Sequence, residues 1–228
     1  MKRGFIAAFF LIYRCLFIYG QEIVTAERYL ESVSGRYGGI KDYEAGLVIR
    51  SGNSEMSGTV SHLSPSFLRI DFSRPAEQVI VFNGELLTVY LPEYRAVLNQ
   101  NITASKRSGA ASASLATAQG LILLRRNYIP SFVTGPDPIP LDEGSKERVV
   151  KLRLTRRSIS EGFRELILSI DPDTKLIRRI EGRTIAEGLV RFDFSNIRIN
   201  QGIPTQRFIY DSPASANLIN NFLFRDTD

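Results

Sequence analysis

The chain contains no tryptophan, one cysteine and one histidine among its 228 residues. Cys15 lies within the first twenty residues, so loss of that segment would remove the only thiol, and with it disulfides, thiol catalysis and thiolate metal sites. The scarcity of histidine and cysteine gives no spacing typical of a metal centre. We therefore expect no metal and no cofactor, and a domain whose stability depends on its apolar core.

Little net charge remains once the N-terminus is set aside. The formal net charge is +5, but Lys2, Arg3 and Arg14 contribute three of these charges, which leaves +2 for residues 21–228. A polyanion partner requires a larger, clustered basic surface, so we expect no nucleic-acid partner. With 43% hydrophobic residues, the length suits a single domain.

The first twenty residues are typical of an export signal. Lys2 and Arg3 precede an apolar stretch over 5–13, and a second apolar run, 16–19, ends at Gly20. We expect residues 1–20 to be a signal peptide cleaved before Gln21, with cleavage after Ala26 as the next option. The mature chain, 21–228, is then one exported domain.

An uncleaved membrane anchor is the alternative for this segment. Arg14 would then lie near the centre of the bilayer, and few apolar residues follow it, so the pattern favours cleavage. A lipid anchor on Cys15 is disfavoured, because Ile12, Tyr13 and Arg14 stand where lipid-modified cysteines are preceded by small residues.

Hydrophobic periodicity predicts a mainly β (α+β) domain. Helical spacing over 22–37 ends at Gly38 and Gly39, and alternation of period two then begins at Tyr43. The expected strands, about eleven in one antiparallel sheet, are 43–49, 56–63, 67–72, 79–82, 86–91, 96–102, 148–155, 163–170, 175–184, 189–199 and 206–210.

The middle of the chain interrupts the strands with a loop-helix-loop insertion over 103–140. Residues 103–114 are rich in Ser, Ala and Gly and predict a surface loop, 115–127 have helical spacing, and the proline-rich 134–140 predict a second loop.

The strands separate apolar from charged side chains. Leu68, Ile70 and Phe72 share one face, while Arg69 and Asp71 share the other, and the later strands repeat the pattern. Because few helices are expected to cover so many strands, we expect the sheet to curve into an incomplete barrel with a cavity at its mouth. The alternative is that these side chains form an ordinary packed core.

No residue pattern indicates an enzyme. His62 and Ser61 are neighbours in a strand and would point to opposite faces, so we expect His62 to be a surface or turn residue without a catalytic role. Asp171 and Asp173 flank Pro172 in an expected turn, where Asp commonly bonds the backbone. An exported hydrolase acting through His62 is therefore disfavoured.

Three pairs of adjacent arginines remain. We expect them to lie on solvated faces, with phosphate head groups or acidic partners as the alternative. The pairs are Arg125 with Arg126, Arg156 with Arg157, and Arg178 with Arg179.

Several stretches, taken in order over about 27–210, resemble the outer-membrane lipoprotein carrier family, LolA, and its wider group of LolA-like and LolB-like domains. They are the early helix, Tyr43–Gly46, a strand with Gly58 and Val60, 64–70, Arg74 with Pro75, 78–92 with its turn at Asn83–Gly84, 196–200, Ile203 with Pro204, and 208–210.

The resemblance implies an incomplete antiparallel barrel whose short lid helices cover an apolar cavity. It implies a monomeric periplasmic carrier that takes acylated lipoproteins or lipids from an inner-membrane lipoprotein-releasing transporter and passes them to an outer-membrane receptor. The alternatives are a sensor or adaptor of the same fold, which binds lipid or a protein partner without transport, and anchorage to the inner membrane by the uncleaved N-terminus.

We assign sixteen residues to the acyl-chain cavity that the resemblance implies. They are Tyr43, Leu47, Ile49, Leu68, Ile70, Phe72, Ile80, Phe82, Val89, Leu121, Leu124, Leu152, Leu154, Leu168, Phe192 and Phe194. The chain departs from the family at two positions. Ser64 stands where a basic residue commonly precedes the proline of the third strand, and Thr88 stands where an aromatic residue is common.

Overall fold

The computed structural model describes residues 24–102 and 116–222. The expected signal peptide, Cys15 and the loop 103–114 lie outside the described residues. No helix in the described ranges is long and apolar enough to span a membrane.

Two helices form where the sequence combines helical spacing with a capping residue. In α1 (Ala26–Gly38), the Thr25 hydroxyl accepts a hydrogen bond from the Arg28 amide at 3.2 Å. In α2 (Ala118–Asn127), Thr117 accepts one from the Gly120 amide at 3.1 Å. Both expected helices are confirmed, and each begins three or four residues later than expected because these threonines cap it.

The strands form one large open sheet. Within the described residues the strands are β1 (Asp42–Ser51), β2 (Ser54–Leu63), β3 (Phe67–Arg74), β4 (Val79–Phe82), β5 (Leu86–Leu91), β6 (Ala96–Asn101), β7 (Tyr128–Phe132), β8 (Ile139–Pro140), β9 (Arg148–Arg156), β10 (Phe163–Ile170), β11 (Ile177–Thr184), β12 (Leu189–Ile199) and β13 (Asn217–Asn220). The order is β13-β6-β5-β4-β3-β2-β1-β12-β11-β10-β9-β7, and β8 pairs with β9.

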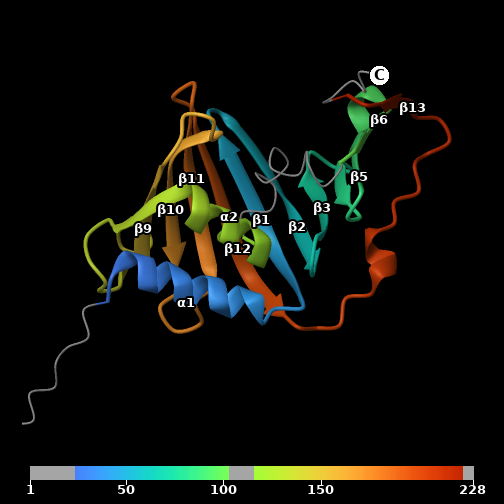
Figure 1. Ribbon diagram of the computed structural model, residues 1–228. Helices are drawn as coiled ribbons and strands as arrows, with labels where there is room; N and C mark the ends of the chain where they lie inside the picture. The colour runs from blue at the N-terminus through green and yellow to red at the C-terminus, as the bar shows by residue number, and fades with distance from the viewer. Residues whose placement is uncertain (1–23, 103–115, 223–228) are drawn as a thin grey trace, which may run out of the picture.

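All neighbouring strands are antiparallel except β13 and β6, which are parallel. The junction of β1 with β12 joins the N-terminal strands to the C-terminal strands, while β13 and β7 are the two ends of the order. The mainly β, incompletely closed architecture expected from the sequence is therefore confirmed. Figure 1 shows α1 and α2 on the side of the sheet formed by β9–β12 and β1.

Ten of the eleven expected strands are confirmed, and the eleventh is wrong. Residues 206–210 fall largely in a short 3-10 helix, η4 (Thr205–Phe208), because they cross the sheet instead of extending it. Strands β7, β8 and β13 were not expected from the sequence. A second 3-10 helix, η1 (Pro92–Tyr94), links β5 to β6.

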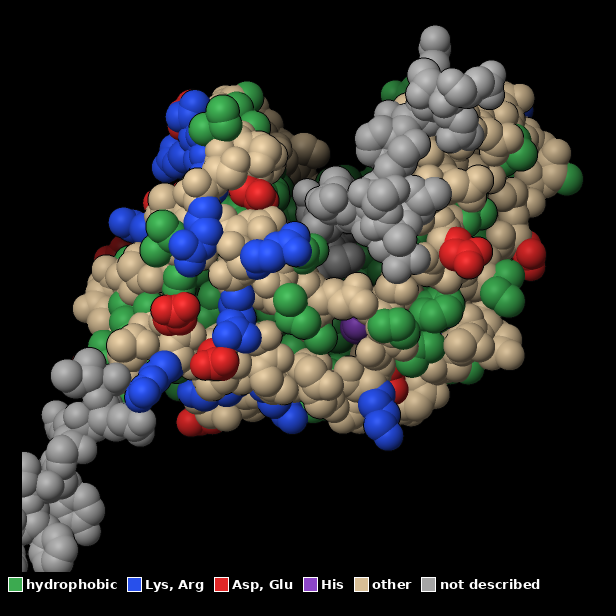
Figure 2. Space-filling model, viewed as in Figure 1, with side chains coloured by type: hydrophobic (Ala, Val, Ile, Leu, Met, Phe, Trp, Pro, Cys, Tyr) green, Lys and Arg blue, Asp and Glu red, His purple; other side chains and the backbone are tan. Residues whose placement is uncertain are grey.

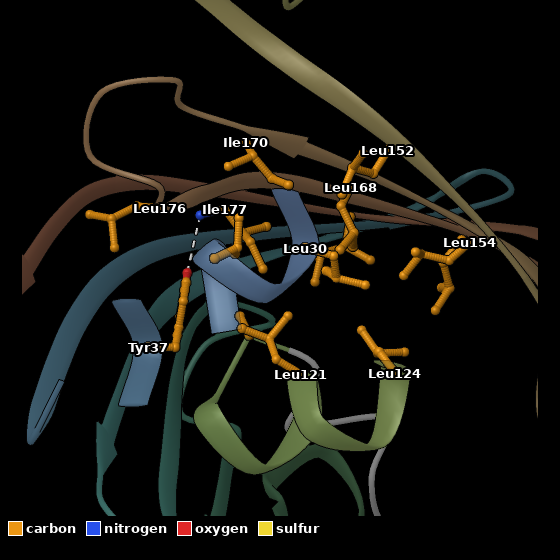
Figure 3. Packing of buried hydrophobic residues seen from close by; sticks show 14 of the residues in the cluster. Leu30, Tyr37, Leu121, Leu124, Leu152, Leu154, Leu168, Ile170, Leu176 and Ile177 are labelled. Atoms are coloured by element: carbon orange, nitrogen blue, oxygen red, sulfur yellow. Dashed lines mark hydrogen bonds between the residues drawn. The ribbon is translucent and has the colours of Figure 1, made fainter. Parts of the chain in front are cut away.

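The core lies between the two helices and the inner face of β9–β12 and β1. Leu30 from α1 and Leu121 from α2 are almost fully buried, and both point towards Leu152 and Leu168 of the sheet (Figure 3). Burying each such side chain contributes about 1.5–3 kcal/mol. The Tyr37 hydroxyl accepts a hydrogen bond from the Ile177 amide at 3.1 Å, which fixes the end of α1 against β11.

The C-terminal segment crosses the outer face of β3–β5. Phe208 is buried there, with its ring centroid 5.5 Å from that of Phe67. Arg69 donates hydrogen bonds to the backbone oxygens of Arg207 and Ile209, and Arg207 pairs with Asp71 at 2.6 Å. These contacts explain why this segment lies across the sheet as a second layer.

A loop before β9 covers part of the outer face of β11 and β12. Asp142 accepts hydrogen bonds from both terminal nitrogens of Arg179 at 2.7 and 2.8 Å, and Asp193 accepts one from Arg179 Nε at 2.5 Å. Arg178 pairs with Glu147 at 2.5 Å. The expectation of a solvated face is wrong for Arg179, which is buried because these carboxylates neutralise its charge.

Candidate ligand-binding interior

The strands place apolar side chains from distant parts of the chain in continuous cross-strand rows. One row runs from β9 to β2 through successive pairs of facing residues: Leu152, Leu168, Ile180, Phe192, Ile49 and Met56. Another runs from β2 to β6: Val60, Ile70, Ile80, Val89 and Leu98. The inner face is therefore apolar across nearly the whole sheet.

All fourteen strand residues assigned to the cavity from the sequence lie on this inner face, and Leu121 and Leu124 cover it from α2. Fifteen of the sixteen belong to the apolar cluster or pack against it. Val89 is half-buried and lies beyond that cluster, opposite Ile80 and Leu98. The alternation of apolar and polar residues along the strands predicted that the assigned strand residues share one face. Their contact with a ligand stays a proposal.

The helices fill much of the space over β9–β12. A cavity of about 10 Å³ lies where the end of α1 meets β1, β11 and β12, and Tyr37, Tyr43 and Phe194 are among the residues that line it. That volume suits about one water molecule, whereas sites for small organic ligands occupy roughly 300–1,000 Å³. This cavity is therefore too small for an acyl chain.

The half of the inner face formed by β3–β6 is less covered by helices. Ile80, Phe82 and Val89 are only half-buried. Figure 2 shows the surface hollowed between the part of the molecule that carries α2 and β9–β11 and the part formed by β3–β6. A further groove of about 290 Å³ lies between α1, α2 and β7, with Leu30, Arg125 and Arg126 among its lining residues.

One polar pair stands on the inner face and was not anticipated from the sequence. His62 of β2 faces Tyr43 of β1, with the two ring centroids 5.3 Å apart, and both side chains are buried. The expectation that His62 is a surface or turn residue is wrong, because its strand position points inward. The alternation that placed Leu68 and Ile70 inside also places His62 inside, and that signal was available in the sequence.

Burial controls the electrostatics of this pair. It lowers the pKa of His62, although a hydrogen bond between Nδ1 and the Phe67 carbonyl oxygen at 2.8 Å and the nearby Asp42 act in the opposite direction. Burial also raises the pKa of Tyr43, so both rings are neutral at pH 7. Ser61 lies on the other face, 3.5 Å from Glu44 Oε2, and forms no catalytic pair with His62.

The two departures from the family pattern are Thr88, which lies on the outer face, and Ser64, which lies directly after the end of β2. Thr88 is buried on the outer face, where its hydroxyl donates to Asn99 Oδ1 at 2.9 Å. Ser64 follows β2, and its backbone amide donates to the Lys41 carbonyl oxygen at 2.7 Å. Thr88 therefore does not line the interior.

The remaining candidates have structural surroundings. Asp171 accepts hydrogen bonds from the amides of Asp173 and Thr174 at 3.0 and 2.7 Å, so the expected backbone role in the turn is confirmed. Within residues 24–102 and 116–222, no group of three or more His, Cys, Asp or Glu side chains is arranged to hold a metal ion.

No family model and no curated protein matches the chain, but several solved structures do. A conserved protein from Thermus thermophilus is 14% identical, with a TM-score of 0.55 over 86% of this chain and 98% of that chain. Pseudomonas aeruginosa MucB, in a complex with MucA, is 15% identical, with a TM-score of 0.51 over 85% and 63% of the two chains. Mycobacterium tuberculosis lipoprotein LppX is 11% identical, with a TM-score of 0.50 over 79% and 97%.

At these identities the likeness concerns the fold, and the chain covers less than two thirds of the MucB structure. A LolA superfamily protein from Nitrosomonas europaea is also among the matches, at 15% identity and a TM-score of 0.42. The described residues of this chain form an open sheet of thirteen strands, curved over two helices. The incomplete, mainly antiparallel barrel covered by helices that the resemblance implied is confirmed, and the Thermus thermophilus protein and LppX share this fold.

Proposed function

We propose that this protein is an exported carrier that holds acyl chains of lipoproteins or lipids against the inner face of its sheet and shuttles them from the inner to the outer membrane. The observation that carries the proposal is the pair of apolar rows that cross the sheet without a polar residue. Among the described residues, α1 and α2 are the α-helices that lie over this face. The resemblance to lipoprotein carriers supports the same function.

The physical chemistry of acyl chains fits such a face. Each methylene removed from water contributes about 0.8 kcal/mol, so burying about fourteen of them would contribute about 11 kcal/mol before the cost of opening the protein. An acylated cargo cannot cross an aqueous compartment unshielded. The curved apolar sheet supplies the shield.

Cargo exchange requires that the interior open and close. Leu121 and Leu124 of α2 occupy the space above Leu152 and Leu154, so an entering chain would replace these protein contacts with lipid contacts of the same kind. Because the lipid contacts replace protein contacts, the net free energy of binding is smaller than the free energy gained by burying the acyl chain. A carrier needs this moderate affinity in order to release its cargo.

We further propose a periplasmic location, with a membrane transporter as donor and an outer-membrane receptor as acceptor. The apolar run within residues 1–20 supports export, and the resemblance to the carrier family supports the two partners. The assignment of the sixteen inner-face residues as the acyl-binding surface belongs to the same proposal.

A sensor or adaptor that binds lipid or a protein partner without moving it is the second candidate. The specific observation in its favour is the fold likeness to MucB, whose structure is a complex with MucA. A sensor would retain its ligand, whereas a carrier would release it to an acceptor membrane.

A transfer assay separates these functions. The mature protein is mixed with donor vesicles that contain a self-quenched fluorescent diacyl lipid and with unlabelled acceptor vesicles. The carrier proposal predicts dequenching at a rate proportional to protein concentration. Stoichiometric binding without transfer would support the sensor, and neither binding nor transfer would overturn both lipid-based proposals.

A further inference from the structure

Two neighbouring turns carry exposed isoleucines at one end of the sheet. Ile159, in the turn between β9 and β10, is 83% exposed, and Ile185, in the turn between β11 and β12, is 50% exposed. The turns are adjacent because Phe163 at the start of β10 pairs with Thr184 at the end of β11. Both turns lie at the upper left of Figure 1. Single exposed apolar side chains are common, so these two matter only together with the charges around them.

Arginines flank both turns. Residues 156–164 contain three arginines and one glutamate, and residues 183–187 contain one of each. Glu187 pairs with both Arg164 and Arg183. Figure 2 shows basic and hydrophobic side chains next to one another at this end of the molecule. The turns therefore combine apolar tips with an excess of positive charge.

The C-terminal end of α2 brings two more arginines to the same corner. The Arg157 amide donates a hydrogen bond to the carbonyl oxygen of Asn127 at 2.8 Å, and Asn127 follows Arg125 and Arg126 at the end of α2. Arg125 pairs with Glu31 of α1, whereas the ion pairs of the described residues include none for Arg157. Two of the three arginine pairs that stand out in the sequence therefore meet in the fold.

We call residues 125–127, 156–164 and 183–187 the arginine rim. It contains six arginines and two glutamates, and counting Glu31 as a third acid leaves an excess of three positive charges. The rim adjoins the apolar inner face, since Leu154 of β9 faces Leu166 of β10, and both are fully buried only two residues from the segment 156–164. An acyl chain drawn into the protein at the rim would meet this pair first.

We propose that the arginine rim docks this protein on the surface of an anionic phospholipid bilayer. The arginines lie against lipid phosphates, where each strengthens binding about fivefold, and Ile159 and Ile185 enter the layer between the head groups. The excess of positive charge complements an anionic surface. Neither isoleucine lines the two cavities described above, so both are free to enter a deformable surface.

The docking itself does not depend on acyl binding. Its consequence, that cargo enters and leaves at the rim, deepens the proposed carrier function and rests on it. A carrier that meets both membranes through the same rim would hold its apolar inner face next to the bilayer during exchange.

Insertion of the tip is tested with a single fluorescent probe. The chain has no tryptophan, so Ile159→Trp introduces the only one. With vesicles of equal parts phosphatidylcholine and phosphatidylglycerol, we expect a blue shift of its emission and quenching by brominated acyl chains, and neither with phosphatidylcholine alone. Ile209→Trp is the matched control, because Ile209 is 64% exposed on the C-terminal segment, and it should show neither effect.

The role of charge is tested by co-sedimentation of the mature protein with the same anionic vesicles. Arg157→Gln keeps the backbone hydrogen bond to Asn127 and should bind the vesicles about fivefold more weakly than the parent. Lys146→Gln is the control, since Lys146 is exposed in the loop before β9, at the other end of that strand, and its binding should equal that of the parent. Added salt should weaken the binding of the parent.

The outcomes separate docking from the carrier function. Equal fluorescence changes at positions 159 and 209, no change at 159, or equal binding by Arg157→Gln and the parent would overturn the docking, whether or not the protein binds acyl chains. Binding to polyglutamate without binding to anionic vesicles would also overturn it and indicate an acidic protein partner. Vesicle docking by a protein that takes up no fatty acid would support the rim and contradict the carrier proposal.

Discussion

Arg125 of α2 donates a hydrogen bond to Glu31 of α1 at 2.8 Å, and this ion pair joins the two helices that cover the inner face. Glu31 is 62% exposed, so solvent screens the pair, and such pairs contribute at most about 1 kcal/mol. The apolar contacts of Leu121 and Leu124 therefore provide most of the attachment of α2.

Glu31→Gln should speed the uptake of acyl chains slightly. The variant loses the charge that faces Arg125, and a loss of up to about 1 kcal/mol corresponds to an increase of at most about fivefold in the fraction of molecules with α2 displaced. Stopped-flow fluorescence with a labelled fatty acid measures the rate. Raising the salt concentration should speed uptake to a similar extent in the parent protein and should change the rate of the variant little. Slower uptake by the variant would contradict a role of this ion pair in holding α2.

Phe192→Glu should abolish acyl binding. Phe192 lies half-buried between Ile180 and Ile49 in the long apolar row, and a carboxylate there would lose its contact with water, without a partner, when an acyl chain binds over it. Leu189→Glu is the matched control, since Leu189 is on the same strand but 53% exposed. We expect at least a tenfold loss of fatty-acid affinity for the first variant and none for the second. Equal binding by both would show that the cargo occupies another face.

Gly58→Ala should destabilise the fold by about 1–3 kcal/mol, as overpacking does. A Cβ atom on Gly58 would lie 2.2 Å from the Asp71 carbonyl oxygen and 2.8 Å from the Phe72 Cα, both of them backbone atoms at an irregularity in the pairing of β2 with β3. Gly35→Ala in α1 is the opposite case, because nothing lies within 4 Å of its added Cβ. The Gly35→Ala variant should have a free energy of unfolding about 0.5–1 kcal/mol higher than that of the parent protein. Urea unfolding measures both changes.

The stability of the protein should fall in acid through Asp142. Its hydrogen bonds to Arg179 lower the pKa of this carboxyl from 3.8 to about 2. Since the folded state keeps the group ionised where the unfolded chain binds a proton, its stabilisation is complete above about pH 4 and is lost as the pH falls to about 2.

Asp142→Asn should therefore weaken the pH dependence of the unfolding free energy between pH 2 and about 4. The comparison requires the same change in an Arg179→Met background, where the carboxylate has already lost its partner. An equal effect of Asp142→Asn in both backgrounds would show that Arg179 is not the cause of the shift.

Local alternation was sufficient to predict most of the sheet. Leu68, Ile70 and Phe72 are spaced as one face of a strand, and the structure buries all three. The same reasoning failed for 206–210, where the ion pair of Arg207 with Asp71 holds the segment across the sheet. No local pattern contains that contact, because the two residues are far apart in the sequence.

Two further errors have a similar physical cause. His62 was expected at the surface or in a turn, whereas its place in β2, opposite Tyr43 of β1, buries it. Arg179 follows another arginine and suggested a solvated face, whereas Asp142 and Asp193 bury it from a loop and a neighbouring strand. Burial of polar side chains depends on partners that the fold brings together.

Native mass spectrometry of the mature protein, purified from its exported compartment without detergent, tests the central claim most directly. The carrier account predicts a removable mass, lost on organic extraction, that fragments as an acylated molecule. Re-addition of a fatty acid should restore a bound species in the parent and not in Phe192→Glu. An apo mass before and after extraction, together with no uptake of a fluorescent fatty acid, would contradict acyl binding and leave the inner face as a packed core.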